Sequence, residues 1–350
     1  MEKSRNSNIE LLRLVLMAFV VLLHFNNPSM GGAFEIVKNL SAENNIFRLL
    51  EAFCSCAVNC FMIVSGYFLF TNTKLRFGKI VEVLIIVIFY RFFDYIGRFL
   101  FLHEVFSIPH LVACLFPANY FAIFYVVCYL FSPFVAKIFR ECSDKNINFL
   151  MGALLVVFII IPSFLDVAID FKIFKDPGFL SPISILRNAN GYTIIQFFTM
   201  LCLGMWIRKI EFNPKTWILV LVYCVSSICI WIFEDRSFAL SYNQILNVLA
   251  AVSLFLLFKK IRTQNNFINF AAKSCFAIFC IHTGLFANTL WTKYCITVEH
   301  FSNGVVESIV WMFISVLVMF TGCLLISIIM QMLFGKVKTR ICNLLPTIVI

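Results

Sequence analysis

The first long apolar run of the chain, residues 9–25, is long enough to cross a bilayer, yet it carries Arg13 and His24. A charged side chain inside a membrane helix costs roughly 2.5–3.5 kcal/mol on insertion scales, so both residues need a partner or a function. On an α-helix the two positions lie about 16 Å apart along the axis and about 20° apart around it. The sequence therefore predicts that Arg13 and His24 face the same side of one membrane helix.

Further apolar stretches of similar length follow along the whole chain and indicate a polytopic membrane protein. Hydrophobic residues make up 61% of the 350 residues and charged residues 13%, which is more apolar surface than a soluble core buries. We predict an all-α bundle of about ten transmembrane helices, forming a single membrane-embedded domain over 1–350 with no appended soluble domain. The predicted spans are 9–25, 47–70, 80–101, 120–139, 147–165, 191–207, 216–233, 242–258, 271–290 and 305–334.

Lys and Arg residues gather in alternate connections between these spans, beginning with Lys3 and Arg5 before the first span. The positive-inside rule places such connections in the cytoplasm, so both termini are expected to be cytoplasmic. The outer connections, which include the long loop 166–190, hold few basic residues. The basic residues behind the net charge of +10 are therefore expected mainly at the cytoplasmic membrane surface, and no nucleic acid is expected as a partner. Arg13 also argues against a cleaved signal peptide.

Three further features of the spans carry predictions. Ser65 and Gly66 interrupt the bulky second span, as happens where another backbone or a ligand comes close. His282 lies past the midpoint of the ninth span, at a depth similar to that of His24. Arg91 and Asp94, three residues apart in the third span, are expected to pair. The fourteen cysteines lie mostly in apolar runs without metal-ligand spacing, so neither a metal site nor a disulfide framework is expected.

Five segments follow one another along the chain: the Arg13 and His24 helix, FMIVSGYFLF at 61–70, YVVCYLFSPF at 125–134, LCLGMWIRK at 201–209 and SCFAIFCIHTG at 274–284. In this order they resemble those of the acyltransferase family 3 integral membrane proteins, which O-acylate cell-surface sugars in bacteria. The resemblance implies a core of about ten helices, an acyl-CoA donor on the cytoplasmic side and a glycan hydroxyl as acceptor. It also implies a functional role for Arg13 and His24.

The inner loop after the second span departs from the family pattern. It reads TNTKLRFGKI and contains Lys74, Arg76 and Lys79, whereas many members carry paired arginines there. Because CoA is polyanionic, we expect these three residues to bind its phosphates, with Arg13 holding a phosphate or the pantetheine end deeper in the membrane. Acetyl-CoA is the expected donor substrate, and no permanently bound cofactor is expected.

Transfer of an acyl group from a thioester to an alcohol requires a base, and His24 is the candidate because histidine titrates near neutral pH. Donors to the developing oxyanion are expected from His282, Ser65 or backbone groups. The acyl-CoA donor is expected on the cytoplasmic side, whereas the base His24 lies near the outer face, so a distance remains between the donor and the base. Either the pantetheine arm reaches into the membrane core, or a histidine carries the acyl group across.

The expected function is O-acetylation of a cell-surface or lipid-linked polysaccharide in the bacterial cytoplasmic membrane. The alternative is a polytopic transporter or a lipid-linked glycan flippase, in which the same ionisable residues would line a substrate path. The two halves of the sequence show no repeat of the kind that many transporters contain.

Overall fold

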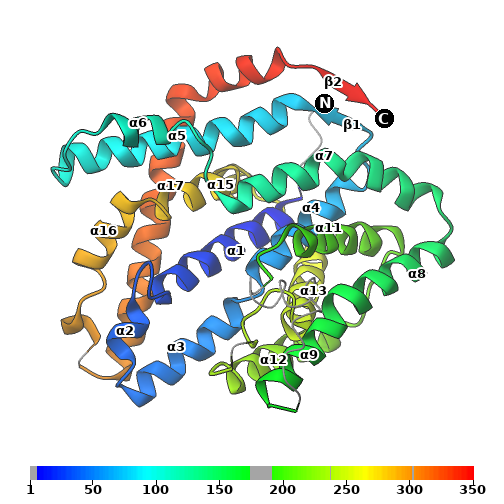
Figure 1. Cartoon of the computed structure of the whole chain (residues 1–350), viewed down its shortest axis with the longest axis horizontal. Helices are drawn as coiled ribbons and strands as arrows, with labels where there is room; N and C mark the ends of the chain where they lie inside the picture. Colours follow the sequence, from blue (N-terminus) through cyan, green and yellow to red (C-terminus); the bar gives the residue numbers. More distant parts are fainter. Residues whose placement is uncertain (1–5, 174–190, 237, 302) are drawn as a thin grey trace. The chain divides into compact units, whose positions relative to one another are not determined.

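The computed structural model describes residues 6–173, 191–236, 238–301 and 303–350, and most of these lie in helices, with two short strands among them (Figure 1). Lys3, Arg5 and positions 174–190 of the predicted outer loop lie outside the described residues. Contacts within the chain define two compact units, each assembled from separate stretches. Unit 1 comprises Met1–Phe47, Arg76–Val126 and Gln264–Thr347, and unit 2 comprises Arg48–Leu75, Val127–Thr263 and Ile348–Ile350.

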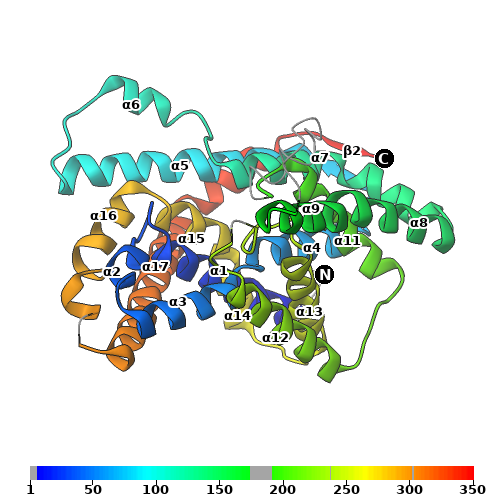
Figure 2. The same cartoon turned by 60° about the horizontal axis from the view of Figure 1, so that its bottom comes forward.

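Unit 1 holds the first helix, the segment around α5 and about the last quarter of the chain. Its elements are α1 (Ser7–Asn26), α2 (Ala33–Val37), α5 (Phe77–Phe101), α6 (Ile108–Ala113), α14 (Asn266–Ala271), the 3₁₀ turn η2 (Ala272–Ser274), α15 (Cys275–His282), α16 (Leu285–Tyr294), the 3₁₀ turn η3 (Val298–Phe301) and α17 (Val305–Asn343). Helix α1 packs against α14, α15 and α17, and α5 packs against α15, α16 and α17. Figure 2 shows α6 on the side of α5 that faces away from α16.

Unit 2 contains the central helices of the chain, of which α4 and α11 lie side by side (Figure 1). Its elements are α4 (Ala57–Leu69), α8 (Asp144–Leu155), the π-helical turn η1 (Val156–Ile160), α9 (Ile161–Asp170), α11 (Ile194–Lys209), α12 (Thr216–Ile232) and α13 (Ile245–Lys260). Four elements contribute residues to both units: α3 (Ser41–Cys54), α7 (Tyr120–Glu141) and the two paired strands β1 (Lys74–Arg76) and β2 (Thr347–Val349).

Several of the helices have the length and apolar character of membrane spans. Within the described residues, five segments qualify, or six if α14–α15 and the bent continuation α16 count as one span. The five are Ser7–Asn26, Ala42–Leu69, Tyr120–Glu141, Asp144–Asp170 and Val305–Asn343. The all-α class is thus confirmed, whereas ten crossings, a single domain and cytoplasmic termini stay predictions.

In unit 2, two glycines allow the backbones of α4 and α11 to approach each other. A Cβ atom at Gly66 would overlap the carbonyl of Leu201, and one at Gly204 would overlap the carbonyl of Ile63. The predicted close approach is therefore confirmed at Gly66, and the neighbour is the backbone of α11. Gly204 is the glycine of the LCLGMWIRK segment, so both glycines have a packing role.

We expect Gly66→Ala and Gly204→Ala each to destabilise the protein, because an added methyl group must push the two helices apart. Overpacking of this kind costs about 1–3 kcal/mol. Gly152→Ala in α8 is the matched control, since a Cβ at that position meets nothing within 4 Å. Thermal unfolding in detergent measures the difference. Equal melting temperatures for all three variants would contradict the packing role.

Candidate active site

The C-terminal end of α1 is held by a tight reversal of the chain directly after His24. Pro28 follows the last helical residues and cannot continue the hydrogen-bond pattern of a helix. The backbone N–H of Gly31 then donates to the carbonyl of His24 over 2.9 Å. A Cβ at position 31 would overlap the backbone of Phe25, so only glycine fits this reversal. The backbone carrying His24 is thereby tied to the loop that follows.

An aromatic cluster sets the rotation of α1 at this level. Phe25 is fully buried, and its ring centroid lies 6.1 Å from that of Phe47, 5.6 Å from that of Trp291 and 6.0 Å from that of Phe301. Successive residues on an α-helix point about 100° apart. Burial of Phe25 in this cluster therefore determines the direction in which the His24 side chain leaves the helix.

His24 points at His282, the last residue of α15. Nδ1 of His24 lies 2.7 Å from Nε2 of His282, and Nδ1 of His282 lies 2.7 Å from the carbonyl oxygen of Ile278 one turn earlier. His282 is fully buried, whereas His24 is partly exposed. The prediction that the two histidines lie at similar depth is confirmed, and they are in direct contact.

The partners of these two rings determine which nitrogen atoms carry protons. A carbonyl oxygen only accepts, so Nδ1 of His282 must donate to Ile278, and Nε2 of a neutral His282 is then an acceptor. Nδ1 of His24 must therefore donate to that nitrogen, which leaves the lone pair of a neutral His24 on Nε2. Among the described residues none hydrogen-bonds Nε2 of His24. The pair thus presents one oriented basic nitrogen.

Arg13 lies about three turns before His24 on α1 and has a carboxylate partner. Its Nη1 donates to Oε2 of Glu10 over 2.8 Å, and both side chains are largely shielded from solvent. The Cys275 thiol on α15 also lies within electrostatic range of the guanidinium. Arg13 and His24 therefore both face α15, as the helical spacing predicts. Sequence reasoning missed Glu10, although opposite charges three residues apart are the usual signal for such a pair.

The basic segment, residues 74–79, lies on β1 and the first turn of α5. Lys74 and Arg76 extend from the exposed face of β1, whereas Leu75 between them is buried. Nζ of Lys79 donates to Glu82 over 3.0 Å. The same carboxylate accepts from Lys338 of α17 over 2.7 Å. One acidic group thus partly neutralises two lysines, and Lys338 is a basic residue that sequence reasoning did not connect with this segment.

The two side chains predicted as oxyanion donors are engaged elsewhere. Ser65 belongs to unit 2, and its hydroxyl donates to the carbonyl of Phe61 in its own helix over 2.9 Å. Both ring nitrogens of His282 are used, one by His24 and the other by Ile278. This geometry favours a positioning role for His282 over the predicted donation to an oxyanion.

The expected pairing of Arg91 with Asp94 is wrong. Asp94 instead accepts from Nε of Arg98 over 3.1 Å, one turn further along α5. Nη2 of Arg91 donates to the carbonyl of Ala113 at the end of α6. The segment that contains α6 lies against this part of α5 and offers a carbonyl to Arg91, which spacing along one helix does not reveal.

We expect His282→Leu to change the protonation pattern of His24, because it removes the acceptor of the Nδ1 proton. In the wild-type protein, nuclear magnetic resonance of isotope-labelled histidine should show His24 as a single Nδ1–H tautomer. In the variant, the Nε2–H tautomer should appear as well. His103→Asn, at an exposed position with a φ of 55°, is a suitable control because asparagine tolerates that conformation. An unchanged His24 signature in His282→Leu would contradict the deduced proton arrangement.

Comparison with known families gives one match, to the family model described as an acyltransferase domain, acyltransferase 3, over residues 6–328. The matched region includes Arg13, His24, the basic segment and His282. Neither the comparison with curated proteins nor that with solved structures gives a match.

Proposed function

Since this chain belongs to the acyltransferase 3 family, we propose that it transfers an acyl group, most simply acetyl, from cytoplasmic acyl-CoA to a hydroxyl of a cell-surface or lipid-linked polysaccharide. The family match and the apolar helices establish the coarser statement, a membrane acyltransferase. The proposed location is the cytoplasmic membrane of a bacterium. The observation that carries the proposal is the His24–His282 pair with its single free basic nitrogen.

In the proposed reaction His24 is the general base. The acceptor hydroxyl oxygen attacks the thioester carbonyl carbon while its proton passes to Nε2 of His24, and a new C–O bond forms. The C–S bond then breaks, and the CoA sulfur leaves with a proton returned from the His24 imidazolium. Nε2 of His282 accepts the Nδ1–H of His24, and in this way His282 holds the His24 ring in one orientation and stabilises the positive charge that appears on it, as the third member of a catalytic triad does.

The proposed donor site uses positive charge from two places on the chain. The basic segment presents Lys74 and Arg76 to solvent, where the phosphates of CoA are accessible. Arg13 lies deeper in the chain's apolar part, where its guanidinium is held by Glu10 and faces α15. A guanidinium fixed in this way suits the polar pantetheine arm or a phosphate.

We expect His24→Ala to reduce acylation by about 10²–10⁴-fold, because removal of a general base has an effect of that size. The measurement is the intensity of O-acyl signals in the proton magnetic resonance spectrum of surface polysaccharide from cells that express the variant. Cells with the wild-type chain and cells without it set the limits. His103→Asn is the histidine control and should leave the signals intact. Normal O-acylation with abundant His24→Ala protein would remove His24 from the mechanism.

We expect replacement of Lys74, Arg76 and Lys79 by Gln to weaken CoA binding about tenfold or more, because each charge-assisted hydrogen bond contributes about 1.5–3 kcal/mol. Glu82→Gln should strengthen binding, since it releases Lys79 and Lys338 from their shared carboxylate. Titration of purified protein with CoA measures both effects, and pantetheine, which lacks phosphates, should be insensitive to them.

The charge-matched control for this experiment replaces Lys259, Lys260 and Arg262, which end α13 and follow it. It removes the same charge from another loop and should leave CoA affinity nearly unchanged. If both triple variants weaken binding equally, the effect is one of overall charge and the basic segment is not the phosphate site.

A further inference from the structure

The chain bends sharply just after His282. Helix α15 ends at His282, and α16 begins at Leu285 at an angle of 79° to the preceding helical segment. Two residues, Thr283 and Gly284, make the bend, and the Thr283 hydroxyl closes α15 by donating to the carbonyl of Phe279 over 2.7 Å. The position of His282 therefore depends on what holds the start of α16.

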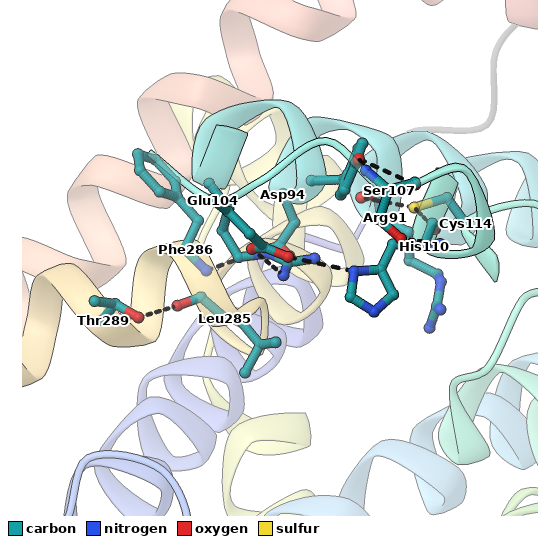
Figure 3. A network of polar contacts seen from close by, with 11 residues as sticks. Arg91, Asp94, Glu104, Ser107, His110, Cys114, Leu285, Phe286 and Thr289 are labelled. Carbon is teal, nitrogen blue, oxygen red and sulfur yellow. Dashed lines mark hydrogen bonds and ion pairs between the residues drawn. The ribbon is translucent and has the colours of Figure 1, made fainter. Parts of the chain in front are cut away.

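The start of α16 has no cap of its own. Gly284 occupies the N-cap position and offers no side-chain acceptor to the first N–H groups of the helix. The acceptor comes instead from α5, where Oδ1 of Asp94 receives the N–H of Phe286 over 2.7 Å. A Cβ at position 284 would overlap this carboxylate oxygen, so the glycine makes room for Asp94. Figure 3 shows Asp94 directed from α5 towards Phe286.

The other oxygen of Asp94 is held by a second set of charges. Oδ2 accepts from Nε of Arg98 over 3.1 Å, and Nη1 of Arg98 pairs with Glu104. Glu104 in turn lies 3.4 Å from Nδ1 of His110 (Figure 3). The side chains of Asp94 and Arg98 are only 16% and 17% exposed, so this contact is well shielded from water. A carboxylate held in this way is also favoured by the positive end of the α16 dipole.

We propose that Asp94 is a positioning residue for the histidine pair: its carboxylate clamps the first turn of α16 and so holds the bend that places His282 against His24. The clamp acts on both partners, because Trp291 of α16 also packs on Phe25, the neighbour of His24. This inference rests on the proposed role of the histidine pair in acyl transfer, but it makes a separate statement about what orients that pair.

The test compares Asp94→Ala with Asp94→Asn. Alanine removes the acceptor for Phe286 and the partner of Arg98, whereas asparagine keeps one carbonyl oxygen at this place. Asp94→Ala should lower O-acylation about 10- to 100-fold, the size expected for a small misplacement of a catalytic group, and Asp94→Asn should lie between it and wild type. CoA affinity should stay unchanged in both variants. Asp94 is separated from the basic segment along the chain, and its proposed role is to position the base His24.

Thr289→Ala in the same helix is the matched control, because it removes a hydroxyl that bonds to Leu285 and leaves the Asp94 contact intact. Should Asp94→Ala fail to accumulate, Arg98→Gln provides a second variant, which loosens the clamp from its other side. Arg98→Gln should also lower O-acylation and should leave CoA affinity unchanged.

The tautomer signal of His24 separates this inference from the proposed function. Asp94→Ala should mix the two tautomers of His24, as is also expected for His282→Leu, and Asp94→Asn should largely restore the single one. That result supports the clamp even if the wild-type protein acylates no polysaccharide, which would overturn only the proposed function. A single unaltered tautomer in Asp94→Ala, with full acylation, would overturn the clamp and leave the proposed function standing.

Discussion

The hydrogen bond between His24 and His282 is the contact on which the candidate site depends. In the described part of the chain it orients a basic nitrogen with no carboxylate bonded to the ring, because the backbone carbonyl of Ile278 fixes the proton of His282 and, through it, that of His24. Such an arrangement suits an apolar interior, where a neutral chain of donors and acceptors avoids the cost of burying an unpaired anion. The reversal at Gly31 and the Phe25 cluster hold one ring, and the bend after α15 holds the other.

Several shielded charged side chains elsewhere in unit 1 are paired with an opposite charge. Arg13 pairs with Glu10, and Arg98 pairs with Asp94 and Glu104. Pairing reduces the cost of keeping an ionised group away from water, although it does not abolish that cost. Asp94 does more than pair with a positive charge, because its carboxylate also accepts the backbone N–H of Phe286.

The fold class and part of the candidate site can be predicted from the sequence. Composition indicates a membrane protein, the helical period places Arg13 and His24 on one face, and the small residues at 65 and 66 mark a close approach of backbones. Two contacts could not be predicted from the sequence, because they depend on how distant segments pack. One is the contact of His24 with His282, and the other is the pairing of Asp94 with Arg98 in place of Arg91. Glu82 likewise binds a lysine of its own helix and one from α17, and no local pattern contains the second.

Unit 1 closes on itself only when three separated stretches of chain have met, and its histidine contact joins residues 258 positions apart. During synthesis, His24 therefore lacks its His282 partner until the last quarter of the chain, which contains α15, has been made. Assembly of the candidate site is consequently a late event in biogenesis. A nascent chain interrupted before α15 would hold Arg13 and Glu10 together but would contain no oriented base.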